Sequence, residues 1–590
     1  VKRNKNIYEG LETKDLSIKI LNEKSNGKEI SYLTSFNTLA GEVKFQNEVN
    51  FIKEKFEYKL VWKDSIIFPQ LESTDKVRID TVEAERGQIL DRNGKVLAGK
   101  GVASSVGLVP GKIQDKENTI IKLAELLEVD IDVIKNKLSA EWVKDDSFVP
   151  IKTIPKVSEL ELMKINPDEN LVKLKENQEE LLSIPGVMIN DIEVRDYPLK
   201  EAASHLVGYI QKVTAEDLEE NKGKGYDSNS VIGRSGIESL YEDKLKGQNG
   251  CMIYIEDEFG NRKDIIVDKP VQNGEDIQLT IDAELQKVLY EQFKDDKSCS
   301  VAMNQYTGEV LALVSTPSFN SNDFVMGMSD KLWKSLNEDE RQPLYNRFRQ
   351  VWCPGSTFKP VTAVIGLDTG ILDPVEDYGN EGLSWQKDSS WGDYYVTTLH
   401  ETEPATLENA MIYSDNIYFA KVALKLRENN LTSFLEKLGF NKEIPFDIKM
   451  SISQYSNTEG IKSEIQLADS GYGQGEILVN PIHMASIYSA FANDGNMVKP
   501  YIEAKNINTV EYLVENAFSK EAANTIKDDL IQVVENPEGT ANDMKVSGRT
   551  IAGKTGTAEL KASKDAQADV LGWFDCFTTD ENNNQLLIVS

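Results

Sequence analysis

Ser356 and Lys359 form the first pair of residues in this sequence that could do chemistry. They follow Pro354-Gly355 and open an apolar stretch, and Pro360 suits a first helical turn, so we predict a helix N-terminus at Ser356. Because positions i and i+3 share a helix face, the Lys359 amine can reach the Ser356 hydroxyl. A serine becomes nucleophilic when a base takes its proton, and lysine can be that base if burial and a nearby cation lower its pKa.

This SxxK pattern is weak evidence when it stands alone. Ser25, Ser73 and Ser384 open the same pattern elsewhere in the chain. A capped helix with a surface lysine fits most such matches equally well. The pair at 356 and 359 therefore needs partners from other parts of the sequence.

Ser414-Asp415-Asn416 is the second candidate, between two stretches of helical periodicity at 406–413 and 417–427. A loop at this place could aim Ser414 and Asn416 into one cleft. A second hydroxyl could pass a proton from Lys359 towards a leaving amine, and the asparagine amide could hold a substrate backbone group. Alone, the tripeptide fits a plain helix cap.

Lys554-Thr555-Gly556-Thr557 is the third candidate, in a run of β-branched residues that predicts a strand. Gly556 would allow a substrate backbone to approach closely. Lys554 and Thr555 together could bind a carboxylate. The backbone N–H groups of Ser356 and Thr557 could form an oxyanion hole. Alone, the tetrapeptide fits an ordinary edge strand.

Two glycine patterns suggest nucleotide binding and fail closer tests. Residues 548–555 match GxxxxGK[ST], but this motif needs a helix that opens at the lysine, whereas Gly556 and Thr557 favour a strand. Only 35 residues follow Thr555, too few for the rest of such a domain. Residues 471–475 lack the last glycine of the dinucleotide fingerprint. An ATPase is therefore disfavoured.

The composition excludes other classes of function. The chain has 97 acidic and 66 basic residues and a net charge of -31, so we expect no nucleic-acid partner. Histidines and cysteines show neither metal-ligand spacing nor a CxxC pair, so we expect no metal site. We expect free thiols, although two disulfides stay possible. The three histidines are His205, His400 and His483, and the four cysteines are Cys251, Cys299, Cys353 and Cys576.

The length of 590 residues indicates three or four domains at about 150 residues each. No apolar run reaches the roughly 18 residues that a membrane span needs. The chain begins at Val1 without a signal peptide, so we interpret it as a fragment. We predict strands within 51–68, a hairpin around Asn93-Gly94, helices over 118–140, 157–183 and 233–250, a strand over 277–281, a helix capped by Asp282, and the main domain boundary near 273–274.

Further segments extend the pattern over nearly the whole chain: Trp62–Pro69, Glu85–Gly94, Arg195–Pro198, Ser204–Tyr209, Gly233–Glu238, Trp385–Gly392 and Asp469–Glu476. SxxK, SDN and KTG in this order form the signature of penicillin-binding proteins and class A β-lactamases. Together with these segments, the chain resembles a class B penicillin-binding protein, a monofunctional peptidoglycan DD-transpeptidase. It is similar to the low-affinity, methicillin-resistance-type branch with an NTF2-like N-terminal domain. We interpret its stalk motifs as structural.

The resemblance implies a multidomain α/β fold. A C-terminal serine transpeptidase/β-lactamase-like domain, an antiparallel sheet flanked by helices, would stand on an elongated α+β stalk. The expected domains are an incomplete NTF2-like domain at 1–68, a dimerisation or pedestal-like domain at 69–275 and a transpeptidase domain at 276–590. The expected location is the extracellular face of the bacterial membrane, with an anchor that this chain lacks.

The implied reaction needs no cofactor and no metal. Ser356 attacks the penultimate D-Ala of a peptidoglycan stem peptide, and an amine of a neighbouring strand then attacks the ester. Lys359 would be the base and Ser414 the proton relay. The implied ligands are Asn416 for a substrate amide, Lys554 and Thr555 for the carboxylate, Gly556 for close approach, and Thr557 for the oxyanion. β-Lactams would acylate the same serine, slowly in the resistance-type branch, and a separate glycan polymerase is an implied partner.

Three other functions share these motifs. A class A β-lactamase needs a glutamate after SDN, and the Glu403-Pro404 segment precedes Ser414. A DD-carboxypeptidase would use water as the acceptor. A non-enzymatic β-lactam sensor would not need a long stalk. The motifs give Cys353, close to the candidate nucleophile, no role.

Overall fold

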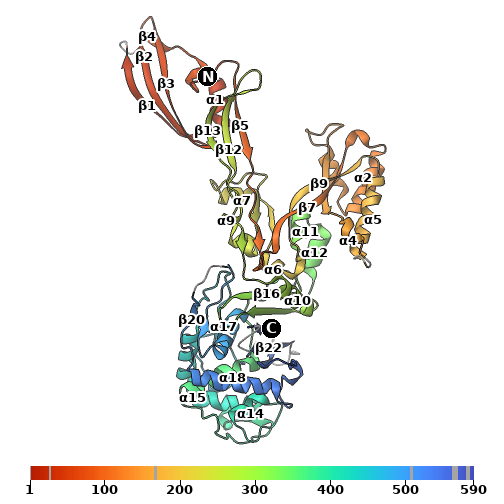
Figure 1. Cartoon of the computed structure of the whole chain (residues 1–590), viewed down its shortest axis with the longest axis vertical. Helices are drawn as coiled ribbons and strands as arrows, with labels where there is room; N and C mark the ends of the chain where they lie inside the picture. The colour runs from red at the N-terminus through yellow and green to blue at the C-terminus, as the bar shows by residue number, and fades with distance from the viewer. Residues whose placement is uncertain are drawn as a thin grey trace. The chain divides into compact units, whose positions relative to one another are not determined.

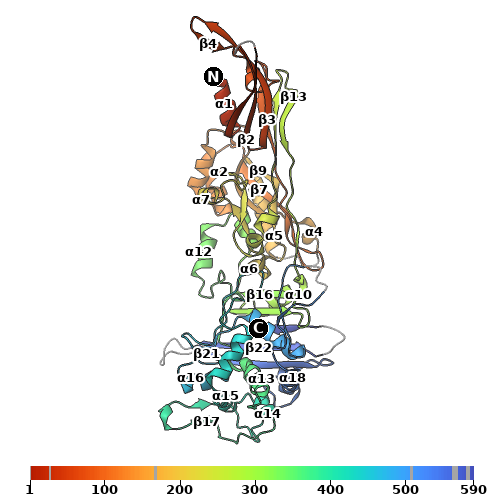
Figure 2. The ribbon, with the colours of Figure 1, turned by 90° about the vertical axis from the view of Figure 1, so that its left-hand side faces the viewer.

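The computed structural model describes residues 2–24, 28–164, 166, 169–504, 509–560, 569–579 and 585–590 (Figures 1 and 2). The chain divides into two compact units. The first unit comprises Val1–Gln88, Lys212–Ile232 and Tyr241–Ile277. The second unit comprises Ile89–Gln211, Gly233–Leu240 and Gln278–Ser590. The predicted middle domain, 69–275, thus contributes to both units.

The first unit begins with helix α1 (Lys2–Gly10) and an antiparallel sheet in the order β1-β2-β3-β4 (Figure 1). The strands are β1 (Lys14–Lys24), β2 (Glu29–Thr38), β3 (Gly41–Glu54) and β4 (Glu57–Leu60). The predicted strands are confirmed up to residue 60. The expected strand at 66–68 is wrong, because η1 (Asp64–Ile66) is a 3-10 turn that delivers Ile67 and Phe68 into the core instead.

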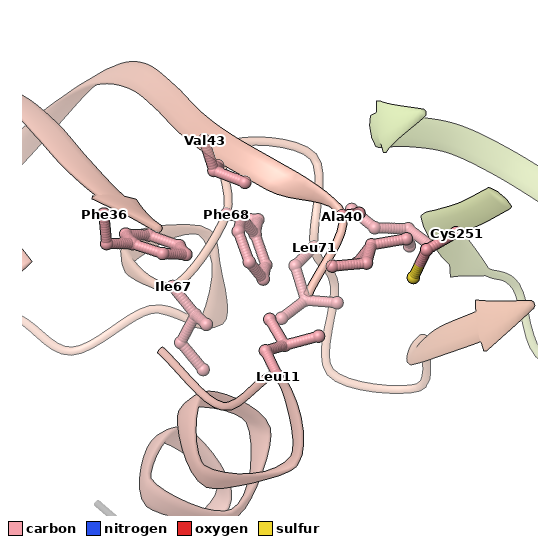
Figure 3. Close-up of a cluster of buried hydrophobic side chains, with 10 residues drawn as sticks. Leu11, Phe36, Ala40, Val43, Ile67, Phe68, Leu71 and Cys251 are labelled. Carbon is pink, nitrogen blue, oxygen red and sulfur yellow. The ribbon is translucent and has the colours of Figure 1, made fainter. Parts of the chain in front are cut away.

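The core of the first unit joins segments that are far apart in the sequence. Phe36, Phe68 and Leu71 are at most 2 % exposed and pack beside Cys251 of β12 (Gly250–Glu256), as Figure 3 shows. Strand β12 pairs with β5 (Lys76–Val82) and with β13 (Arg262–Lys269). The N-terminal sheet therefore shares its core with residues about 180 positions later. The burial of apolar side chains there offsets the entropy lost on closing this long loop.

The second unit opens with the predicted hairpin. Strand β6 (Ile89–Leu90) pairs with β7 (Val96–Leu108), which lies between β8 (Val149–Pro155) and β9 (Val187–Asp196). The helix predicted at 118–140 is two helices, because Glu128 has φ 48° and ends the first one. The region 157–183 also holds two. The helices are α2 (Lys116–Leu127), α3 (Ile131–Leu138), α4 (Glu159–Leu162) and α5 (Glu169–Ser183).

The single helix predicted over 233–250 is wrong. Helix α8 (Gly236–Leu240) and helix α9 (Glu242–Leu245) are separate. Gly236 has φ 58°, and a Cβ there would lie 2.4 Å from the carbonyl oxygen of Leu206, so the turn into α8 needs glycine. The remaining short elements up to residue 233 are η2 (Pro110–Lys112), η3 (Lys200–Ala202), α6 (Ser204–Val207), β10 (Ile210–Lys212), α7 (Ala215–Glu220) and β11 (Val231–Gly233).

A five-stranded antiparallel sheet in the order β16-β15-β23-β22-β21 forms the centre of the C-terminal part. Its strands are β15 (Ser298–Met303), β16 (Val310–Thr316), β21 (Ile551–Leu560), β22 (Asp569–Thr578) and β23 (Leu587–Val589). The short β14 (Ile277–Gln278) precedes α10 (Ala283–Phe293), whose predicted cap is confirmed: Asp282 accepts from the N–H of Glu284 at 3.0 Å.

Helices cover both faces of this sheet (Figures 1 and 2). Helix α10 packs on one face, where Leu289 meets Ala302 and Val314. Helices α17 (Pro481–Ala492) and α18 (Lys520–Glu535) lie against the sheet from the other side. The predicted antiparallel sheet flanked by helices is therefore confirmed.

The remaining elements lie between the strands of this sheet in the sequence. They are α11 (Ser321–Met326), α12 (Asp330–Glu338), η4 (Gly355–Phe358), α13 (Lys359–Asp368), β17 (Ser384–Trp385), η5 (Ser389–Trp391), β18 (Val396–Thr397), α14 (Leu407–Ile412), α15 (Asn416–Leu438), α16 (Glu464–Ser470), β19 (Met497–Val498), β20 (Tyr512–Val514) and η6 (Asn542–Met544). All four cysteines are free thiols. Among the described residues, no helix is both long and apolar enough to span a bilayer.

A buried ion pair explains two of the stalk motifs as structural. Arg195 Nε lies 2.7 Å from Glu238 Oε1, and their side chains are 4 % and 0 % exposed. The Tyr197 hydroxyl donates to the same oxygen at 3.2 Å and accepts from the N–H of Ile210 at 3.0 Å. The Arg-Asp-Tyr motif and the Gly-Arg-Ser-Gly-Ile-Glu motif thus meet through one carboxylate.

We predict that Glu238→Ala lowers the free energy of unfolding by about 3–5 kcal/mol, because it strands a buried guanidinium. Urea unfolding followed by circular dichroism measures the change. Glu193→Ala, on the strand β9 that also carries Arg195, is the control, since its ion pair with Lys100 is exposed and is worth about 1 kcal/mol at most. Equal losses in the two variants would contradict the prediction.

Candidate active site

Ser356 lies in the 3-10 turn η4, and α13 begins at Lys359, with Pro360 in its first turn as predicted. The backbone N–H of Gly355 donates to the carbonyl of Gly473 at 3.0 Å. Gly355 has φ 53°, and a Cβ there would lie 2.5 Å from the carbonyl oxygen of Thr557. The turn that carries Ser356 is thus clamped between two backbones. Within the described part of the chain, the half-buried Ser356 hydroxyl has no hydrogen-bond partner.

Lys359 is completely buried, and its amine points to Ser414. Nζ donates to the Ser414 carbonyl at 2.6 Å and to Ser414 Oγ at 3.0 Å, and it lies 5.8 Å from the centroid of the Phe419 ring. Burial, and then the charge of Lys554, hold the pKa of Lys359 well below its usual value. The amine is therefore suited to accept a proton.

Ser414 lies in the predicted turn between α14 and α15 and has φ 56°, a strained value for a residue with a side chain. Asp415 fixes this turn, because its carboxylate accepts from the N–H groups of Ile417 at 2.8 Å and Tyr418 at 3.2 Å. The cap starts α15 and aims the Ser414 hydroxyl at the lysines.

Lys554 is completely buried on the edge strand β21, opposite Asp575 in the register. Its Nζ donates to Ser414 Oγ at 3.0 Å and to the Thr555 carbonyl at 3.2 Å. Burial lowers the pKa of Lys554 to about 7. The strand through Lys554 also confirms that the GxxxxGK[ST] match is no phosphate-binding loop.

The structure thus brings Lys359, Ser414 and Lys554 together from three remote segments. A serine oxygen can accept two hydrogen bonds, so both amines can bind it while its own proton stays available. Two ammonium groups beside one hydroxyl, away from water, repel each other, and this favours a state with one neutral amine. The cluster can therefore store a proton and pass it on.

The predicted substrate ligands have other contacts here. Asn416 is the first residue of α15, and its amide donates to the Thr397 carbonyl of β18 at 2.8 Å. The Thr555 hydroxyl donates to Thr540 Oγ1 at 2.9 Å. A Cβ at Gly556 would lie 2.8 Å from the Pro354 carbonyl oxygen, so this glycine also lets η4 pack on β21. The exposed Thr557 presents its carbonyl to Gln474 Nε2 at 3.4 Å.

A supporting segment, residues 469–476, was missed as part of the site. The Gly473 carbonyl accepts from the Cys353 thiol at 3.2 Å as well as from Gly355. Gln474 links Cys353, 3.7 Å away, to Thr557. Cys353 therefore helps to fix the turn that carries Ser356, a contact that its sequence position does not reveal. The glycine-rich run at 471–475 was the available signal, because glycines permit such close backbone approach.

Two tyrosines converge on one carboxylate in this supporting segment. The hydroxyls of Tyr394 and Tyr472 both donate to Asp469 Oδ1. Tyr394 belongs to the hairpin of β17 and β18, which also accepts the Asn416 amide at Thr397. The hairpin is therefore held at two points: Thr397 binds Asn416 of the SDN turn, and Tyr394 binds Asp469 of the supporting segment.

Comparisons with known proteins identify the family of this chain. The chain matches the penicillin binding protein transpeptidase domain over residues 298–590, the penicillin-binding protein dimerisation domain over 81–279 and the NTF2-like N-terminal transpeptidase domain over 1–75. The chain belongs to the class B penicillin-binding proteins, the serine-type peptidoglycan D,D-transpeptidases, with an NTF2-like N-terminal domain.

Individual relatives show the same relationship. Penicillin-binding protein 3 of Bacillus subtilis is 41 % identical over 100 % of this chain and 86 % of its own length. The peptidoglycan D,D-transpeptidase MrdA of Acinetobacter baumannii is 29 % identical over 84 % of this chain and 74 % of its own. The complex of PBP2 and MreC from Helicobacter pylori has a similar fold, with a TM-score of 0.67 at 21 % identity, over 87 % of this chain and 94 % of that one.

We predict that acylation by a fluorescent penicillin slows as the pH rises through about 7, the pKa of Lys554. Below that pH the amine is charged and can pair with the ligand carboxylate, and above it the charge is lost. The second-order rate constant between pH 5.5 and 9 reports this free-enzyme pKa. Lys554→Arg keeps its charge over this range. Its rate constant, although lower, should therefore not fall as the pH rises above 7. The same fall in that variant as in the native protein would contradict the assignment.

We predict that Tyr394→Phe slows the same acylation by roughly tenfold, or about 1.4 kcal/mol, because it frees the hairpin from Asp469. Stopped-flow labelling measures the rate. The control is Tyr395→Phe, the adjacent and exposed tyrosine, which should label at the normal rate. Equal rates in all three proteins would show that the tie between Tyr394 and Asp469 does not position the site.

Proposed function

We propose that this chain cross-links peptidoglycan stem peptides through an acyl-enzyme on Ser356. The observation that carries the assignment of roles is the pair of buried amines, Lys359 and Lys554, on the Ser414 hydroxyl beside the turn of Ser356. This arrangement supplies a base, a relay and a cation within one cleft, as serine acyl transfer requires.

The first step begins when the neutral amine of Lys359 takes the proton of Ser356. The serine oxygen attacks the carbonyl of the penultimate D-Ala, and the N–H groups of Ser356 and Thr557 stabilise the oxyanion. Ser414 passes a proton to the leaving nitrogen, so that the peptide bond breaks and D-Ala departs as an amine. Before the reaction, Lys554 and the hydroxyl of Thr555 hold the terminal carboxylate.

The second step reverses the proton flow. An amine from a neighbouring stem peptide attacks the ester carbon and gives its proton to the cluster. The bond to Ser356 then breaks, and the serine oxygen regains a proton. Asn416 would orient the substrate backbone after its amide releases the Thr397 carbonyl and binds the substrate instead. Gly556 would allow the substrate backbone to approach β21.

We propose that β-lactams acylate Ser356 slowly, as in the resistance-type branch, so that the chain would support antibiotic resistance. Two observations support this. The Lys359 amine donates to Ser414, and no hydrogen bond among the described residues joins it to the Ser356 hydroxyl whose proton it would take. Asn416 is already bound to Thr397 and must exchange partners.

We also infer that the chain acts at the outer face of the bacterial membrane, held there by an anchor, where its substrate lies. A separate glycan polymerase would make the strands that it joins. The Helicobacter pylori PBP2 structure contains MreC, which supports the idea of a protein partner. We place the domain boundaries near 68 and 275, and the three family matches support that division.

We predict that Ser356→Ala abolishes covalent labelling by fluorescent penicillin, whereas the native chain forms an adduct that lasts for hours. Gel fluorescence and intact-mass spectrometry measure the adduct. Ser73→Ala, at an exposed serine that opens another SxxK pattern, is the control and should label normally. Adduct turnover within seconds would indicate a β-lactamase, and release of D-Ala without cross-linked product would indicate a carboxypeptidase. Labelling of Ser356→Ala would refute the nucleophile.

A further inference from the structure

A cavity of about 480 Å³ lies in the second unit, and none of the residues of the SxxK, SDN and KTG motifs line it. Its walls come from the region of α6 and Tyr209, from α8, α11 and α12, and from loops at 344–349 and 448–449. No aspartate or glutamate lines it. A lining that has basic side chains and no carboxylate favours an anionic ligand over a cation.

One wall of this cavity is a cluster of aromatic rings. Phe324 stacks on Tyr209 at a centroid distance of 3.8 Å and meets Phe319 edge-on at 5.5 Å. Trp333 of α12 packs edge-on against Phe324 at 6.4 Å and stays 48 % exposed, and Leu240 on α8 is 44 % exposed. Phe319 and Phe324 are buried, so the cluster is a rigid base with an open apolar rim. Such a surface favours an apolar or aromatic side chain.

Another part of the lining is positively charged. Arg349 and Lys449 are both exposed, and the Nε of Arg349 donates to the Lys449 carbonyl at 3.0 Å, which holds the two residues side by side. Neither forms an ion pair within the described part of the chain. Arg234 adds a third cation to the lining. His205 adds none, because burial lowers its pKa to about 4.

We propose that this cavity binds an acidic peptide segment of a partner protein. An aromatic or aliphatic side chain of the segment would pack on Phe324 and Trp333, and its carboxylates would pair with Arg349 and Lys449. A peptide fits better than a small metabolite, because Trp333 and Leu240 in the lining are about half exposed and leave the apolar part of the cavity open to solvent. Buried aromatic anchors with a charged rim are the usual anatomy of such interfaces.

The test selects peptides against the whole chain. A displayed library of random seven-residue peptides is panned on the native protein and depleted on Arg349→Glu/Lys449→Glu. We expect enriched peptides that carry at least one Asp or Glu beside an aromatic or leucine side chain. A synthetic, fluorescein-labelled copy of the most enriched peptide is then titrated by fluorescence anisotropy. Its affinity should fall at least tenfold in Trp333→Ala and in the double charge reversal, and should fall with added salt.

Controls separate this site from the catalytic cleft and from misfolding. Lys287→Glu reverses the charge of an exposed lysine on α10 and should bind the peptide normally. Ser356→Ala should also bind it normally, so the result does not depend on the proposed transpeptidation. Trp333, Arg349 and Lys449 are all exposed, so the thermal melting of the binding-site variants should match that of the native protein. Failure to enrich any peptide, enrichment of basic peptides, or binding unaffected by Trp333→Ala and the double reversal would overturn the proposal.

Discussion

Two lysine amines taken out of water around one serine hydroxyl are the constraint on which the catalytic part of this molecule depends. Desolvating an ammonium group is costly, and the cost is reduced when the group gives up its proton or finds strong acceptors. The structure offers Ser414 Oγ to both amines, together with the carbonyls of Ser414 and Thr555. The sheet edge, the SDN turn and α13 have to hold these atoms within hydrogen-bonding distance, because slight displacement would leave a buried amine unpaired.

The surrounding contacts show how three remote segments are held in register. Asp415 caps α15, Gly355 and Gly473 allow two backbones to touch, and Asp469 joins two tyrosines from different elements. Together they fix the turn that carries Ser356 on one side and the hairpin of β17 and β18 on the other.

The sequence predicted the parts of the site whose residue types carry the chemistry. Serine and lysine at a helix start, a capped SDN turn and a glycine-bearing strand have local signals, and the structure has the turn, the cap and the strand at these places. The expected contact between Lys359 and the Ser356 hydroxyl is not among the hydrogen bonds of the described residues, because the Lys359 amine donates to Ser414. The Arg195–Glu238 pair and the convergence on Asp469 depend on tertiary contacts between distant segments, which periodicity cannot show. The breaks at Glu128 and Tyr241 were missed because apolar spacing continues across them, while backbone conformation does not. Glu128 enters the left-handed region, and Tyr241 separates two short helices.

The shared core of the first unit has a consequence for how the protein is made. Its N-terminal sheet buries Phe36 and Phe68 against β12, which ends at Glu256. A nascent chain that has emerged only as far as the N-terminal sheet lacks that wall and exposes the apolar side chains meant for it. Folding of this unit must therefore wait until the chain has been synthesised past Glu256, and the early segment needs protection from aggregation in the meantime.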